Sequence, residues 1–389
     1  MTTTFYPPHH IGGDAVFVQY LAEELVKRGH EVHVMTSVDP YRLKKKGGVE
    51  RNIQKSSVII HDLRSPYGIT SPLSAYIFGS SHYYTQRFSE IVRKIKPDVV
   101  HHHNISLLGH GLLKRQGAYL SIHTTHDFWL ICPTYGLTTN KGELCARKQC
   151  LLCTMSQRKP PQFWRHSPAF VNQVHDLDII ISPSKLFRDV LSTAIKGRIV
   201  HIPNFVPAPP KNTPDTIFSN FFLYAGGLER VRGVPTLLDV FSGEDIHSKL
   251  IVVGTGSLAS YVTEFIERKR LHDKIIYFGW VSNEERNSLY KGALATIIPS
   301  EYPANFPLVA LESISHGTPV IASNKGGLPE IVGKVDAKLI YNSTPDLKQI
   351  LLNFDGTKYS SEMVKAIYQK YYAPRSHLKK YLDLIRSSK

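Results

Sequence analysis

The chain has 389 residues, enough for two or three domains, and its 42% hydrophobic and 20% charged residues are ordinary for a globular protein. No run approaches the roughly 18 apolar residues of a membrane span, and the start lacks the features of a signal peptide, so we expect a cytoplasmic protein. The net charge of +15 predicts an anionic partner (a phosphorylated small molecule, an acidic membrane surface or nucleic acid) unless it reflects a generally basic proteome.

Buried strands alternate with helices through the first half of the chain. Residues 16–30 predict a helix that Gly29 ends and whose apolar face is Val18, Leu21, Ala22 and Leu25. Apolar, β-branched runs then predict strands at 31–37, 57–63, 97–104, 120–127, 177–184 and 198–204. This alternation is typical of a parallel sheet covered on both faces.

The loop ahead of the first helix contains Gly12 and Gly13, which permit close approach of a ligand to the backbone, although a plain turn explains them equally well. The strand that normally precedes such a loop is missing, because the chain starts at "MTTTFY". We expect either an open sheet edge or a gene product that begins a few residues earlier.

All four cysteines lie in one irregular segment. Cys132, Cys145, Cys150 and Cys153 have the spacing C-x12-C-x4-C-x2-C, whose C-x2-C end suits a metal chelate. The spacing predicts a structural zinc site. Disulfides, free thiols and, less favoured, an iron–sulfur cluster remain open alternatives.

Two basic stretches, residues 41–55 and 158–166, lie in the first half of the chain. The second interleaves Phe163 and Trp164 with cations, a pattern typical of a peripheral membrane face. Binding of single-stranded nucleic acid and an ordinary solvated loop are the alternatives.

The proline-rich residues 203–216 predict a linker, and a second series of strands follows at 221–227, 249–256, 274–280, 295–300 and 319–323. The fold class is therefore α/β, with two Rossmann-like doubly wound domains facing a central cleft. We place them at residues 1–205 and 206–374, and we expect the helix at 375–389 to return to the first domain.

Residues 301–317 predict a loop feeding a helix. "EYPANFP" follows a strand, and "LVALESISHG" is a helix closed by Gly317. The first turn of a helix has unpaired N–H groups and a partial positive charge, so a diphosphate binds well there. Leu308 and Val309 can supply such N–H groups.

Nine stretches in order, among them "FYPPHHIGGDAVF", "KPDVVHHHN", "HTTHDFW", "GGLERVRG" and "PSEYPANFPLVALES", carry a family resemblance. The chain resembles a family 4 glycosyltransferase, a retaining enzyme of the GT-B fold. The resemblance implies transfer from a UDP- or GDP-sugar to a hydroxyl of a glycan or lipid-linked acceptor, without a catalytic metal. Nucleic acid is then a disfavoured partner.

The resemblance also implies roles for individual residues. Glu312 binds the ribose hydroxyls of the donor, unless it is a plain surface charge, and His126 contacts the donor sugar, unless it is a satisfied core histidine. Arg232 keeps the second cation of the family's G-R-L-x-x-x-K-G pattern, and Gly227 replaces the first. The implied donor site is completed by Gly12, Gly13, Val281, Asn305, Phe306, Leu308 and Val309.

Ala304 departs from the family pattern. It stands at the first glutamate of E-x7-E, which lies against the donor sugar, and Glu301 is three residues too early to replace it. A natural variant, an inactive relative and a deliberate substitution all fit this alanine. The alternatives to a transferase are therefore a weakened sugar-nucleotide-binding relative or, from charge alone, a nucleic-acid-binding protein.

Two further patterns suggest a metal and are discounted. His101 and His103 share one strand face, which we interpret as strand-end structure. The "DLD" at residues 176–178 resembles a metal-binding D-x-D, but it simply enters the strand that follows.

Overall fold

The computed structural model describes residues 1–44, 57–139, 145 and 149–388. It divides into two compact units, residues 1–202 with 379–389 and residues 203–378. The sequence predicted the boundaries between these units at residues 205/206 and 374/375. Of the basic stretch at 41–55, residues 45–55 lie outside the described residues.

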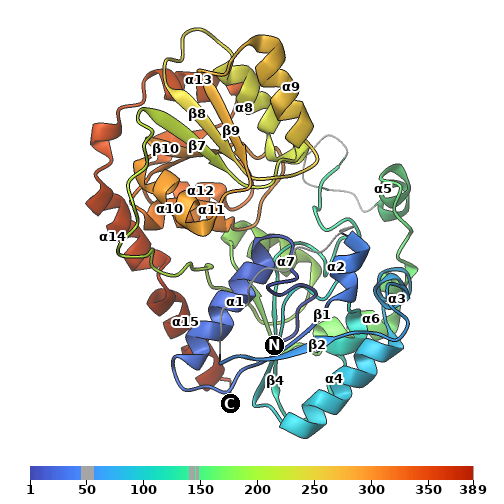
Figure 1. Cartoon of the computed structure of the whole chain (residues 1–389). Coiled ribbons are helices and arrows are strands. Elements are labelled where there is room, and N and C mark those ends of the chain that lie inside the picture. The colour runs from blue at the N-terminus through green and yellow to red at the C-terminus, as the bar shows by residue number, and fades with distance from the viewer. Residues whose placement is uncertain (45–56, 140–144, 146–148, 389) are drawn as a thin grey trace. The chain divides into compact units, whose positions relative to one another are not determined.

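The first unit is built on a parallel sheet (Figure 1). Its strands form two groups, β1 (His33–Ser37) with β2 (Ile59–Leu63), and β3 (Val99–His102), β4 (Leu120–Thr124), β5 (Ile179–Ser182) and β6 (Ile199–His201) in that order. Thr2 joins the two groups, since it bridges in parallel to Met35 of β1 and to His102 of β3.

The first residues of the chain therefore lie in the position of the central strand. The N–H of Thr2 donates to the carbonyl of His101 at 2.9 Å, and the N–H of His103 donates back to the carbonyl of Thr2 at 3.0 Å. The prediction that this strand is missing is wrong. The run "MTTT" is short and polar, and it pairs only because two buried strands flank it.

The first unit also contains a set of helices. They are α1 (Gly13–Val26), α2 (Asp39–Lys44), α3 (Thr70–Phe78), α4 (His82–Ile95), α5 (Cys150–Ser156), α6 (Pro168–His175) and α7 (Lys185–Ala194), with 3-10 turns η1 (His110–Leu113) and η2 (Phe163–His166). The predicted face of α1 is confirmed, because Val18, Leu21, Ala22 and Leu25 are all buried. The end of α15 (Pro374–Arg386) also belongs here, and its Tyr381 hydroxyl lies 2.9 Å from Nδ1 of His101.

The second unit is built on a six-stranded parallel sheet (Figure 1). Its order is β12-β11-β10-β7-β8-β9, with β7 (Phe221–Ala225), β8 (Lys249–Val253), β9 (Ile275–Gly279), β10 (Ala295–Ile298), β11 (Val320–Ser323) and β12 (Ile340–Tyr341). Every residue of β7, β10 and β11 is buried, as expected for strands covered on both faces.

The strand order reverses between β7 and β10. The loops that follow these two strands leave the carboxyl edge on either side of this switch point, where open α/β sheets bind ligands. The helices of the unit are α8 (Val234–Phe241), α9 (Ala259–Lys269), α10 (Asn283–Gly292), α11 (Leu308–Ser315), α12 (Leu328–Val332), α13 (Thr344–Leu352) and α14 (Ser361–Tyr371). None of the helices in the described residues is long and apolar enough to cross a membrane.

Candidate active site

The loops after β7 and β10 are tied to each other. The N–H of Glu301 donates to the carbonyl of Val231 at 2.9 Å, and the Thr236 hydroxyl donates to the Glu301 carboxylate at 2.7 Å. Gly233 has a φ of 74°, and a Cβ there would lie 1.8 Å from the carbonyl oxygen of Pro299. Only glycine allows this close approach. Gly233 therefore lets the two switch-point loops pack directly against each other.

Arg232 precedes this glycine at the end of the short turn η3 (Arg230–Arg232). Its guanidinium lies 5.9 Å from the ring centroid of Tyr302, in the loop after β10. A Cβ on Gly227 would lie 3.6 Å from Nε of Arg232, so Gly227 borders the same guanidinium. Arg232 is thus a half-buried cation at the switch point, and guanidinium groups suit a diphosphate.

Glu312 lies on α11 and is held by two side chains of α10. The Tyr290 hydroxyl donates to its Oε2 at 2.9 Å, and Nη2 of Arg286 lies 3.8 Å from Oε1. Only 15% of the Glu312 side chain is exposed. The alternative that Glu312 is a plain surface charge is therefore wrong, because its carboxylate has a fixed position.

Tyr290 organises this part of the site. Its ring is fully buried and stacks on His316 with centroids 5.4 Å apart. Burial lowers the pKa of His316, and its Nδ1 lies 2.8 Å from the carbonyl oxygen of Glu312. Val281 and Val309, two predicted donor residues, pack against the apolar cluster that contains Tyr290.

Sequence reasoning missed Tyr290 and Arg286. They stand four residues apart on α10, a spacing that places both side chains on one face of a helix. The spacing was visible in the sequence, but nothing in the sequence indicates that this face of α10 packs against α11.

Ala304 is buried, with 3% of its surface exposed. Its N–H donates to the carbonyl of Tyr302 at 2.8 Å, and its own carbonyl accepts from the N–H of Gly327 at 2.8 Å. A Cβ on Gly326 would lie 2.1 Å from the Ala304 carbonyl oxygen. The loops after β10 and β11 therefore clamp the backbone of Ala304.

The residues after Ala304 lead into α11. Asn305 and Val309 are half-buried, whereas Phe306 and Leu308 are buried. The Phe306 ring meets Tyr372 edge-on at 6.0 Å between centroids, so its side chain supports the loop. No side chain of the described residues caps α11, and the first N–H groups of a helix have no acceptor within it.

In the first unit, a second cluster of polar side chains lies at the carboxyl edge of the sheet. Nε2 of His126 lies 3.0 Å from Nδ1 of His103, and the edge of Phe17 meets both rings. Gly12 begins α1 with a φ of 87°, and the Asp14 carboxylate accepts from Asn104 Nδ2 at 2.9 Å. Burial lowers the pKa of His126, and Asp14 opposes that shift.

The start of α1, which contains Gly13 and follows Gly12, therefore lies near His126, because Asp14 acts on the pKa of His126 and Phe17 contacts its ring. Asp14 and Asn104 were missed, although an acidic residue directly after two glycines is a visible signal. His101 has its Nδ1 on Tyr381 and its Nε2 on Thr124, at 2.9 and 2.8 Å, which agrees with a structural role.

None of the four cysteines forms a disulfide in the described part of the chain. Cys132 is buried with its sulfur 3.3 Å from the Thr134 hydroxyl, and the Cys153 sulfur accepts from Gln157 at 3.5 Å. No group of three or more histidine, cysteine or acidic residues among the described residues is arranged to hold a metal. The zinc site stays a prediction.

Trp164 does not form an exposed face, and that part of the membrane prediction is wrong. Its Nε1 donates to the carbonyl of Tyr76 at 3.1 Å, and its ring stacks on His110 and meets Phe170 edge-on. Phe163, its neighbour, is 71% exposed. Aromatic residues next to cations look the same in sequence whether they face a core or a surface.

Two units with parallel, doubly wound sheets of this kind are the architecture of the GT-B fold. The model of Glycosyltransferase Family 4 matches residues 11–208, and that of Glycosyl transferases group 1 matches residues 216–353. The chain belongs to glycosyltransferase family 4, and the predicted class of enzyme and the predicted GT-B fold are confirmed.

Relatives and solved structures agree along nearly the whole chain. An uncharacterized glycosyltransferase of Methanocaldococcus jannaschii is 26% identical, covering 95% of this chain and 93% of the relative. The alpha-monoglucosyldiacylglycerol synthase of Streptococcus pneumoniae is 24% identical, covering 90% and 76%.

Among structures, sucrose-phosphate synthase of Thermosynechococcus elongatus has a TM-score of 0.71 at 18% identity, covering 99% of this chain and 98% of that one. HepE of Anabaena, solved with UDP, has a TM-score of 0.63 at 13% identity, covering 99% of both chains.

Proposed function

We propose that this glycosyltransferase takes its sugar from a nucleoside diphosphate donor held by the second unit. Arg232 binds the diphosphate, together with the N–H groups of Leu308 and Val309 at the start of α11, and Glu312 accepts the ribose hydroxyls. The observation that carries this proposal is the fixed carboxylate of Glu312, held by Tyr290 and Arg286 beside the switch point. The UDP bound to the structural neighbour HepE supports a uridine donor.

The proposed reaction retains the configuration of the sugar. The acceptor hydroxyl attacks the anomeric carbon on the face from which the diphosphate departs, the bond to the phosphate oxygen breaks, and the hydroxyl proton leaves with the diphosphate. The α11 N-terminus and Arg232 stabilise the charge that develops on the leaving group. No step requires a metal ion. The role of His126 toward the donor sugar stays a prediction.

The proposed acceptor is a glycan or lipid-linked hydroxyl compound at the cytoplasmic face of a membrane. The net charge of +15 supports an anionic surface or acceptor. The streptococcal relative is named as an alpha-monoglucosyldiacylglycerol synthase, which gives one example of a lipid acceptor among related proteins.

A panel of UDP- and GDP-sugars tests the donor proposal, with release of the nucleoside diphosphate as the measurement. One donor is expected to be turned over, and Arg232→Ala is expected to reduce kcat by about 10²-fold, as for loss of a charged leaving-group contact. Arg268→Ala on the exposed part of α9 is the matched control. Equal loss in both variants, or no turnover of any donor, would contradict the assignment.

A second candidate is a weakened enzyme that binds donor but transfers slowly. The observation in its favour is the pair Ala304 and Gly227, which remove a carboxylate and a cation from the family pattern. Tight nucleotide binding together with slow turnover of every donor would favour it.

A further inference from the structure

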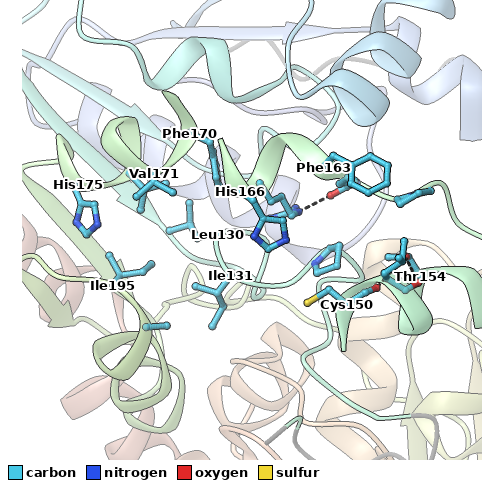
Figure 2. A pocket seen from close by; sticks show the side chains of 17 residues that line it. Leu130, Ile131, Cys150, Thr154, Phe163, His166, Phe170, Val171, His175 and Ile195 are labelled. Atoms are coloured by element: carbon cyan, nitrogen blue, oxygen red, sulfur yellow. Dashed lines mark hydrogen bonds between the residues drawn. The ribbon is translucent and has the colours of Figure 1, made fainter. Parts of the chain in front are cut away.

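A cavity of about 490 Å³ lies in the first unit. Its walls are the loop after β4, α5, η2, α6 and the end of α7. It extends from His175 and Ile195 at one end to Phe163 and Thr154 at the other, with Leu130 and Ile131 between them (Figure 2). Most lining residues are apolar, and the volume falls within the range of about 300–1,000 Å³ typical of ligand sites.

Large apolar side chains surround the α5 end of this cavity and face solvent. Leu151, Leu152 and Met155 of α5 are 49%, 65% and 61% exposed, and Phe163 of η2 is 71% exposed. Arg158 and Lys159 follow the C-cap residue of α5, so two cations stand close in the chain to this apolar surface. Apolar side chains mixed with cations suit the interface of an anionic membrane.

The cavity is also lined by a half-buried cation, Arg165. The Arg165 guanidinium lies over the rings of Trp164 and Trp129 at 4.6 and 5.6 Å, and its Nη1 donates to the carbonyl of Trp129. Its Nη2 is buried and has no hydrogen-bond partner among the described residues. Its Nε donates to Oε1 of Gln162 at 2.6 Å, so its hydrogen bonds among the described residues go to neutral groups.

Burial lowers the pKa of Arg165 to about 10 and raises the pKa of Asp127, an acidic side chain that acts on it, to about 7. Asp127 therefore neutralises Arg165 only in part at neutral pH. A buried N–H donor on a cation without an acceptor is costly, and an anionic ligand group would satisfy it.

We propose that this cavity binds the hydrocarbon chain of an anionic lipid, with the phosphate of that lipid on Arg165. The elongated apolar lining suits a chain, Arg165 suits a phosphate, and the exposed residues of α5 and η2 border the membrane from which the lipid enters. The inference rests on the proposed function in one respect, since it gives the lipid-linked acceptor a place for its apolar part.

Dodecyl phosphate is the probe, titrated below its micelle concentration against the full chain. Trp129 and Trp164 lie beside Arg165, so occupancy of the cavity is expected to change tryptophan fluorescence in a saturable way. Inorganic phosphate is expected to have no effect, and dodecyl maltoside, which has the chain without the charge, is expected to bind about tenfold more weakly.

Two variants separate the parts of the site. Val174→Phe fills the cavity and is expected to weaken dodecyl phosphate binding at least about tenfold, whereas Val240→Phe, an equally buried change on α8, leaves it unchanged. Arg165→Gln is expected to weaken dodecyl phosphate but not dodecyl maltoside. Thermal unfolding of each variant checks its folding.

A missing saturable response, or equal affinity of wild type for both detergents, overturns the proposal without any variant. Release of nucleoside diphosphate from the donor is measured in parallel. If that release persists while dodecyl phosphate fails to bind, this inference alone fails. If dodecyl phosphate binds while no lipid accepts sugar, the cavity assignment stands and the lipid-acceptor part of the proposed function fails.

Discussion

The Glu312 carboxylate is held in place by Tyr290 and Arg286 of α10. This arrangement determines the expected effects of replacing Glu312 and of replacing Tyr290. Glu312→Ala is expected to weaken nucleoside diphosphate binding by one to two orders of magnitude, because a charged hydrogen bond contributes ~1.5–3 kcal/mol. Tyr290→Phe keeps the packing and removes only the hydroxyl that donates to Oε2. Its expected effect is smaller, up to about tenfold. Titration calorimetry with UDP and GDP measures both.

Glu267→Ala, an exposed change on α9, is the control for these two variants. Unchanged nucleotide affinity in Glu312→Ala would remove this residue from the donor site. An equal loss in Glu312→Ala and Tyr290→Phe would instead point to collapse of the α10–α11 contact, which a lowered Tm would show.

At Ala304 the missing carboxylate is expected to affect transfer and not nucleotide binding. Ala304→Glu is expected to raise the transfer rate by about 10²-fold, the effect of one well-placed charged contact. Because Ala304 is buried and its backbone is clamped by Gly327, Ala304→Gln is the control of equal size. Turnover of the donor found in the panel is the measurement. Equal or lower activity of the glutamate variant would show that other groups already fill this position.

At the scale of single elements, β4 carries a titratable side chain into the core of the first unit. His123 is 3% exposed, stacks on Trp129, and neither ring nitrogen has a hydrogen-bond partner among the described residues. Burial, with a smaller effect of His126, lowers the pKa of His123 from 6.5 to about 3. The folded state therefore holds this ring neutral, whereas the unfolded chain takes up a proton below pH 6.5.

Because the folded-state pKa is lowered, this contribution to stability is present above pH 6.5 and is lost as the pH falls from 6.5 toward 3. His123→Phe keeps a ring on Trp129 and is expected to reduce the slope of unfolding free energy against pH by up to about 1.4 kcal/mol per pH unit. Urea unfolding between these pH values measures the slope. His272→Phe at an exposed position is the control, and identical slopes in both variants would contradict the prediction.

Titration of Asp127, which follows β4, has the opposite effect on the pH dependence of the unfolding free energy. Burial raises its pKa to about 7, so its contribution is present at low pH and is lost as the pH rises through 7. The two slopes therefore offset each other between pH 3.8 and 6.5, so the His123 effect is obtained as the difference in slope between His123→Phe and the unchanged protein.

The segment from Cys132 to Cys153 is the element for which a metal remains predicted. Elemental analysis of protein purified without chelators is expected to give about one zinc per chain, lost in Cys150→Ser together with thermal stability. Ser156→Ala at the end of α5 is the control. Metal-free protein of unchanged stability would leave these residues as free thiols.

At the scale of the whole molecule, the strands were predictable wherever both faces are buried. The runs at 221–227, 295–300 and 319–323 are almost wholly apolar, and they form β7, β10 and β11. The strand order was not predictable, so nothing in the sequence placed Arg232 and Glu301 at adjacent loops. The strand position of Thr2 depends on β1 and β3, and the buried place of Trp164 depends on Tyr76, so both required tertiary structure.

The net charge of +15 acts at the same scale, and it predicts binding to anionic membranes. Binding to vesicles of phosphatidylglycerol and phosphatidylcholine is expected to fall steeply between about 50 and 500 mM salt, because screening shortens the reach of the charges. Trp164 is partly buried and packs against the core of the first unit, so its replacement would test folding. The informative change is Leu152→Glu with Met155→Glu on α5, whose side chains are 65% and 61% exposed. It is expected to reduce binding at every salt concentration, whereas Ile217→Glu, 93% exposed in the second unit, does not. Equal binding to neutral and anionic vesicles, or to neither, would show that the charge serves a phosphorylated small molecule instead.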